Sequence, residues 1–77
     1  MEFKKLKEFL ADHRITRDEL ANTMHYSKGT MINILGRKGE AEGRLRMGFK
    51  VAVQEILEKR IKRAQEGLDE WDKMTKI

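Results

Sequence analysis

The side chains of this chain that could do chemistry are mainly the cationic groups of lysine and arginine. Among its 77 residues, 17 Lys and Arg outnumber 13 Asp and Glu, which gives a net charge of +4 and a pI near 9.6. Such groups bind phosphates and other anions. The chain has no cysteine and two separate histidines, so a disulfide scaffold, a thiol nucleophile and a Cys-based zinc site are excluded and we expect no metal or other cofactor. No Ser, His and Asp arrangement is present, and the glycines at 36–43 lack the Gly-Lys-Ser/Thr of a P-loop, so we expect no enzymatic activity.

The length of the chain predicts one small domain. A chain this short buries only roughly 60% of its unfolded surface, so a partner subunit can be needed to complete its core. No apolar run approaches the length of a membrane span, and the N-terminus lacks an apolar signal core. We therefore expect a cytoplasmic protein with neither a membrane nor a small-molecule substrate among its partners.

Helical spacing of apolar residues predicts an all-α fold of four to five helices. The first helix covers about 2–12, with lysines on its outer face. Thr16 and Glu19 have the spacing of a capping box, in which the hydroxyl and the carboxylate each accept from a backbone amide, and they predict a second helix over 17–24. Ser27 can cap a third helix over 28–35.

The second half of the chain predicts a long helix that starts near 45. It follows a flexible connection, because four of the six glycines fall between 36 and 48. Gly67 costs about 1 kcal/mol inside a helix, so we expect the long helix to cover about 45–66. A C-terminal packing or dimer segment then covers 67–77. One continuous helix over 45–74 is the alternative, and a strand over 47–53 is disfavoured by the helical spacing that follows it.

The second and third predicted helices have the arrangement of a helix-turn-helix. Ala21 is small where the two helices would cross, Tyr26 can cover the turn, and the apolar contacts come from Leu20, Met24, Met31 and Ile34. Residues 16–35, TRDELANTMHYSKGTMINIL, resemble the helix-turn-helix of the lambda-repressor and Cro-like (XRE-type) family. That family usually has glycine where this chain has His25, because the residue often takes a positive φ, which histidine tolerates at a small cost.

The resemblance implies a compact lambda-repressor-like domain whose third helix enters the major groove of duplex DNA. The base-reading positions of the family correspond to Lys28, Gly29, Thr30 and Asn33, where Lys28 can donate to guanine and Asn33 can pair with adenine. Phosphate contacts are implied for Arg17, Ser27, Arg37, Lys38, Arg44 and Arg46.

These expectations combine into a sequence-specific transcriptional regulator, a small repressor of the phage or mobile-element type. Because one short helix reads only a few base pairs, we expect a homodimer, with half-sites roughly 34 Å apart. A regulatory protein partner is a further candidate.

The charge distribution separates the last residues from the rest of the long helix. Residues 44–63 hold seven basic and two acidic residues, or +5, whereas residues 64–77 hold two basic and four acidic residues, or −2. The acidic end would point away from DNA, and its Leu68, Trp71 and Met74 fit a dimer or partner contact, with Trp71 either in the core or at an interface.

The alternative function is a protein-interaction module, such as an antirepressor or inhibitor, that binds a protein through 45–74. A steep salt dependence would favour DNA and a flat one a protein partner.

Overall fold

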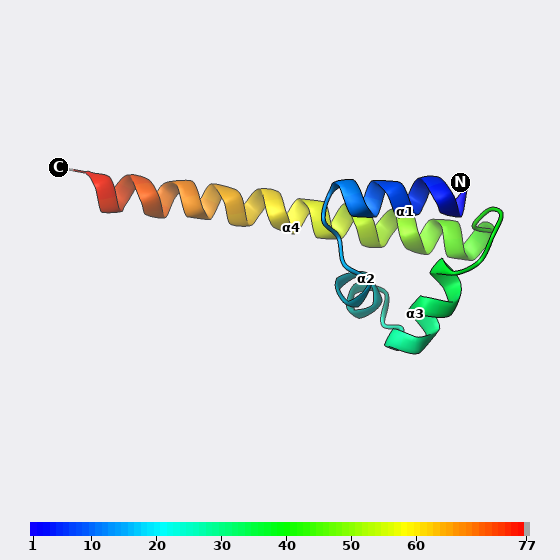
Figure 1. Cartoon of the computed structure of the whole chain (residues 1–77). Coiled ribbons are helices and arrows are strands. Elements are labelled where there is room, and N and C mark those ends of the chain that lie inside the picture. The colour runs from blue at the N-terminus through cyan, green and yellow to red at the C-terminus, as the bar shows by residue number, and fades with distance from the viewer. Residues whose placement is uncertain (77) are drawn as a thin grey trace.

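The computed structural model describes residues 1–76, which form four α-helices and no strand. The helices are α1 (Phe3–Asp12), α2 (Arg17–Met24), α3 (Lys28–Leu35) and α4 (Gly43–Thr75). The all-helical prediction is confirmed, and the strand alternative over 47–53 is wrong because these residues lie inside α4. Figure 1 shows α1, α2 and α3 around the first half of α4, whose second half projects beyond them. The chain measures 55 × 22 × 18 Å. It is therefore elongated, whereas the sequence analysis predicted a compact domain.

The predicted caps explain where α2 and α3 begin. The Thr16 hydroxyl accepts from the Glu19 N–H at 3.1 Å, and the Ser27 hydroxyl accepts from the Thr30 N–H at 3.1 Å. Only half of the expected capping box forms. The carboxylate of Glu19 binds the guanidinium of Arg60 in α4 instead of reaching back to Thr16, because a charged partner gives a stronger bond than a neutral amide.

The core lies between the first half of α4 and the other three helices. Leu20, Met31 and Phe49 are fully buried at its centre. The ring of Phe3 meets Phe49 edge to face, with centroids 6.2 Å apart and planes at 87°. The other buried apolar residues are Leu6, Leu10, Ile15, Ala21, Ile34, Leu35, Ala41, Ala52 and Ile56.

The glycine-rich connection between α3 and α4 is held against the N-terminus. The Phe3 N–H donates to the Gly39 carbonyl at 3.0 Å, and the Ala41 N–H donates to the Met1 carbonyl at 2.9 Å. Gly39 has a φ of 106°, a region open mainly to glycine. The segment predicted as a flexible connection thus contributes a buried side chain, Ala41, to the core.

The long helix does not end near residue 66 as predicted, because α4 continues through Gly67 to Thr75. Nothing lies within 4 Å of the position a Cβ would take at Gly67, so no neighbouring element redirects the chain there. A single glycine costs about 1 kcal/mol, which is less than the loss of a helical turn and a new helix nucleus. Leu68, Trp71 and Met74 are 67%, 63% and 72% exposed, so they pack against no other part of residues 1–76 and Trp71 is not a core residue.

Candidate nucleic-acid interface

The turn between α2 and α3 has the backbone conformation expected from the sequence. His25 has φ 60° and ψ 35°, in the left-handed region, so the predicted positive φ is confirmed. The Tyr26 N–H donates to the Ala21 carbonyl at 2.9 Å, which closes the end of α2 as in a Schellman motif. Ala21 is buried. Figure 1 shows α2 nearly end-on and α3 across the view, so the two helices run in different directions.

Helix α3 divides into a buried face and an exposed face. Met31, Ile34 and Leu35 are turned into the core. The rest of its surface is exposed, and four residues of this surface lie next to one another along the helix. We call them the outer face of α3: Lys28, Gly29, Ile32 and Asn33. Three of these four residues are predicted base-reading positions, and the structure brings them together.

The fourth predicted base-reading position, Thr30, lies at the edge of the outer face and takes part in the cap. Its hydroxyl accepts from the Ser27 hydroxyl at 2.7 Å, while its N–H donates back to Ser27. The hydroxyl proton of Ser27, predicted to serve a phosphate, is therefore used inside the cap. Ser27 sets the direction in which α3 starts.

The polar residues of the outer face are accessible to a ligand. Lys28 lies 3.8 Å from Asp18 in a pair whose side chains are 73% and 64% exposed, and such surface pairs contribute little stability. Its ammonium can therefore change partners easily. Asn33 is exposed and makes no side-chain hydrogen bond within residues 1–76. At Gly29 nothing lies within 4 Å of the position that a Cβ would take, so the backbone there is open to close approach.

Ile32 is a residue that the sequence analysis missed. It is 41% exposed and lies one turn after Lys28 and Gly29, on the outer face. Its position one turn from two exposed residues is the signal that could have identified it, whereas its apolar character suggested a core position. An apolar side chain here can contact the methyl group of thymine.

Basic side chains lie beside the outer face at Ile32 and beyond the C-terminal end of α3. Lys7 of α1 and Arg17 of α2 line the same depression as Ile32 and Gly36. Beyond the end of α3, a second depression gathers the basic residues Lys4, Lys7, Arg37 and Lys38, together with Glu2 and Glu40. Lys7 lines both depressions, so the basic residues follow one another around this side of the molecule, and we call them the basic rim: Arg17, Lys7, Lys4, Arg37 and Lys38. The lysines of α1 were not predicted as site residues, although they follow one face of the first helix.

The two predicted phosphate contacts in α4 separate in the structure. Arg44 lines a depression shared with Arg37 and Lys38, so it extends the basic rim. Arg46 lines neither of the depressions that hold those residues, so no shared depression joins it to the rim. The acidic residues Glu40 and Glu42 lie beside Arg44 and reduce its effect.

Other kinds of site are not found in the described residues. Within residues 1–76 no three His, Asp or Glu side chains come together in a way that could hold a metal ion. No helix of this region is both long and apolar enough to cross a bilayer.

No protein-family model matches the chain, and comparison with curated proteins and with solved structures returns no match.

Proposed function

We propose that this chain is a sequence-specific duplex-DNA-binding regulator, a small cytoplasmic repressor of the phage or mobile-element type that acts as a homodimer. In this proposal α2, the turn at His25 and α3 form a helix-turn-helix of the lambda-repressor-like kind. The outer face of α3 enters the major groove, and the basic rim binds the phosphates on either side.

One observation carries the proposal: the exposed face of α3 that holds the predicted base-reading positions lies beside basic residues of α1 and α2, and two more basic residues follow its C-terminal end. Arg17 and Lys7 flank the outer face on one side, and Arg37 and Lys38 follow its C-terminal end. A groove-reading helix benefits from this arrangement, because contacts to phosphates beside the groove set its depth and direction. Neither catalysis nor small-molecule binding needs it.

The residues of the outer face have distinct roles in this proposal. Lys28 donates to guanine O6 and N7, Asn33 pairs with adenine, and Ile32 contacts a thymine methyl. Gly29 lets the backbone of α3 approach the base edges, since it has no side chain and open space around it. Arg17 and Lys7 bind phosphate and carry no sequence information.

Selection from a random duplex-DNA pool, followed by sequencing, tests the proposal. The pool is incubated with the full chain at near-physiological salt, and the expected result is an enriched motif with two-fold symmetry. A matched selection with the Lys28→Ala, Asn33→Ala double variant is expected to lose the preference at the positions these side chains read. If a folded chain enriches no motif, the proposal is wrong.

The alternative function, a protein-interaction module such as an antirepressor, is favoured by the exposed apolar residues of α4. Ile61, Leu68 and Trp71 are each more than 60% exposed, and an apolar helix face of this kind fits a helix-in-groove contact. The two functions differ in salt dependence. DNA binding through six or so phosphates is expected to weaken by about 10³-fold between 50 and 200 mM salt, whereas an apolar contact is expected to change little.

A further inference from the structure

The second half of α4 is covered by no other segment of the described residues, 1–76. Every described residue from Ile61 to Lys76 is exposed, and Figure 1 shows this part of α4 projecting away from α1, α2 and α3. A helix gains most of its stability in a protein from packing one face against another element. The projecting part of α4 therefore lacks the contact that such a helix normally has.

Apolar residues form a continuous line along this projecting helix. Successive residues of this line lie four, three, four and three positions apart in the sequence, which is the spacing of a coiled-coil seam. We call this line the α4 stripe: Leu57, Ile61, Ala64, Leu68 and Trp71. Leu57 is partly buried against the core, whereas Ile61, Leu68 and Trp71 are 61%, 67% and 63% exposed, so the stripe is unpaired from Ile61 onward.

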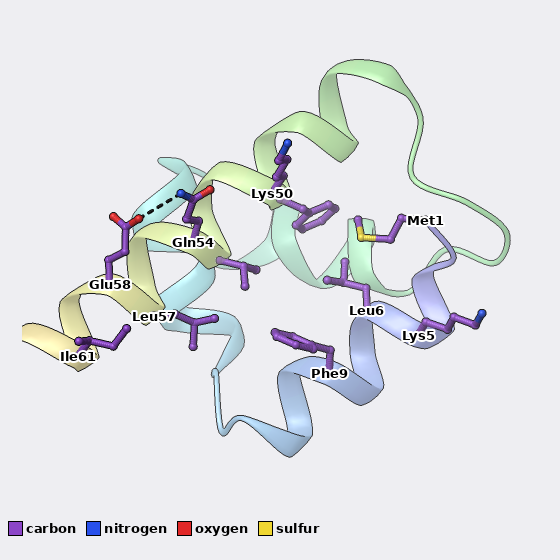
Figure 2. Close-up of a pocket in the computed structure, with 11 residues that line it drawn as sticks. Met1, Lys5, Leu6, Phe9, Lys50, Gln54, Leu57, Glu58 and Ile61 are labelled. Carbon is purple, nitrogen blue, oxygen red and sulfur yellow. Dashed lines mark hydrogen bonds between the residues drawn. The ribbon is translucent and has the colours of Figure 1, made fainter. Parts of the chain in front are cut away.

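The stripe continues into an apolar groove between α1 and α4. This groove has a volume of about 580 Å³, and Leu57 and Ile61 line it together with Leu6 and Phe9 of α1. Figure 2 shows Phe9 and Leu57 on opposite sides of the groove, with Ile61 at the end from which α4 projects. A helix lying on the stripe would therefore bring its end to the mouth of the groove.

The charges beside the stripe identify the helix that can lie on it. Residues 59–63 hold four basic and no acidic side chains, whereas residues 66–72 hold four acidic and no basic ones. Two copies of α4 that run in opposite directions place each basic segment beside the acidic segment of the other copy. Two parallel copies would place like charges together, which is unfavourable. The second half of α4 is therefore complementary to itself.

We infer that the α4 stripe is an antiparallel dimer seam, occupied by the same stripe of a second copy of this chain. With the two-fold axis at Glu66, Ile61 lies opposite Trp71 of the second copy and Ala64 lies opposite Leu68. Small and large side chains then alternate across the seam. Trp71 and Met74 of the second copy reach the mouth of the groove near Phe9. This inference deepens the proposed function by assigning a surface to its homodimer. It rests on the proposed homodimer and does not depend on DNA binding.

Sedimentation of the full chain without DNA, over a wide range of concentrations, tests the seam. The expected result is a monomer–dimer equilibrium that Leu68→Glu abolishes and Trp71→Ala weakens at least tenfold. Val51→Glu is the matched control, because Val51 is a 58% exposed apolar residue of α4 that lies off the stripe. It is expected to dimerise like the unmodified chain. Circular dichroism checks that each variant keeps its helices, as expected for residues outside the core.

Single cysteines test the direction of the two helices, since the chain has no cysteine of its own. Gln65→Cys lies beside the proposed axis, so a short thiol-reactive cross-linker is expected to join two copies. Ile61→Cys lies about 15 Å from its own copy along an antiparallel pair and is expected not to cross-link. The opposite pattern would overturn the antiparallel arrangement.

A chain that stays monomeric at every concentration, or a Leu68→Glu variant that still dimerises, would overturn the seam. Either outcome leaves DNA binding untouched, because the selection experiment measures it separately. A monomer that nevertheless enriches a single half-site would retain the DNA-binding proposal without its dimer.

Discussion

Arg60 of α4 binds Glu19 of α2 across 41 positions of sequence, with 3.1 Å between Nη2 and Oε2. The same guanidinium donates to the carbonyl of Arg14 at 2.9 Å and to the carbonyl of His13. It therefore joins the connection between α1 and α2 to the middle of α4. The neighbouring Lys59 and Arg63 are exposed and make no such contacts, so one residue of this basic run has a structural role.

We expect Arg60→Ala to lower the free energy of unfolding by about 1–2 kcal/mol. The substitution removes a partly buried ion pair and leaves two backbone carbonyls without their donor, and hydrogen bonds that involve a charged group are worth about this much. Urea unfolding measures the change, with Arg63→Ala as the control that removes an equally charged but exposed side chain. Equal effects from the two variants would show that only net charge matters here.

Substitutions at His25 test the left-handed turn between α2 and α3. A β-branched residue is strongly disfavoured at positive φ, so His25→Val is expected to lower the free energy of unfolding by about 1 kcal/mol or more. His25→Gly removes the strain but adds freedom to the unfolded chain, and we expect a gain of about 0.5 kcal/mol or less. The midpoints of chemical denaturation give both values. A valine variant as stable as the unmodified chain would contradict the assigned turn.

Much of the helical part of the fold could be predicted because its signals are local. The caps at Thr16 and Ser27 depend on residues three positions apart, and the conformation of His25 follows from the pattern around one turn. The continuity of α4 could not be predicted from Gly67 alone. It depends on whether another element contacts that glycine, and none does.

The candidate site was only partly predictable, because its missing members come from distant segments. Lys7 joins Arg17 and Ile32 only in the folded chain, where α1, α2 and α3 line one depression. The sequence alone showed lysines on an exposed helix face, which most often are simply solvated. The exposure of Ile32 could not be predicted, because an apolar residue in a short helix is usually buried and its exposure depends on which face of the helix packs into the core.

Gly29→Ala separates the stability of α3 from its approach to DNA. Alanine is a better helix former than glycine by about 1 kcal/mol, and a Cβ at this position meets nothing within 4 Å. We therefore expect the variant to be as stable as the unmodified chain or slightly more stable, yet to bind its selected DNA at least tenfold more weakly. Denaturation and fluorescence anisotropy measure the two quantities. Unchanged DNA affinity would remove Gly29 from the proposed interface.

Arg17 and Lys28 are expected to differ in how they affect DNA binding. Arg17→Ala removes a phosphate contact, so it should weaken binding to all sequences alike and make the dependence of log K on log salt shallower by about one unit. Lys28→Ala should relax preference at one base position, at a cost of about 1–3 kcal/mol for the preferred sequence. Titrations of matched and mismatched duplexes at several salt concentrations distinguish the two. Equal loss on every duplex would refute base reading by Lys28.

The spacing of the DNA half-sites follows from the antiparallel seam. The α4 stripe lies about a quarter turn round the helix from Phe49, Ala52 and Ile56, which face the core. A two-fold axis perpendicular to the helix pair then carries both copies of α3 to the same side, as binding to one duplex requires.

The two copies of α3 are expected to lie farther apart than one turn of DNA. Figure 1 shows α3 beside the first part of α4, and Gly48 in this part lies roughly 27 Å from Glu66 along the helix. The α3 copies then lie on the order of 50 Å apart, more than the roughly 34 Å first expected. The motif from the selection experiment is therefore expected to have half-site centres separated by more than one helical turn. Centres one turn apart would mean that DNA is bound by a dimer formed through another surface, even if the seam of α4 pairs in solution.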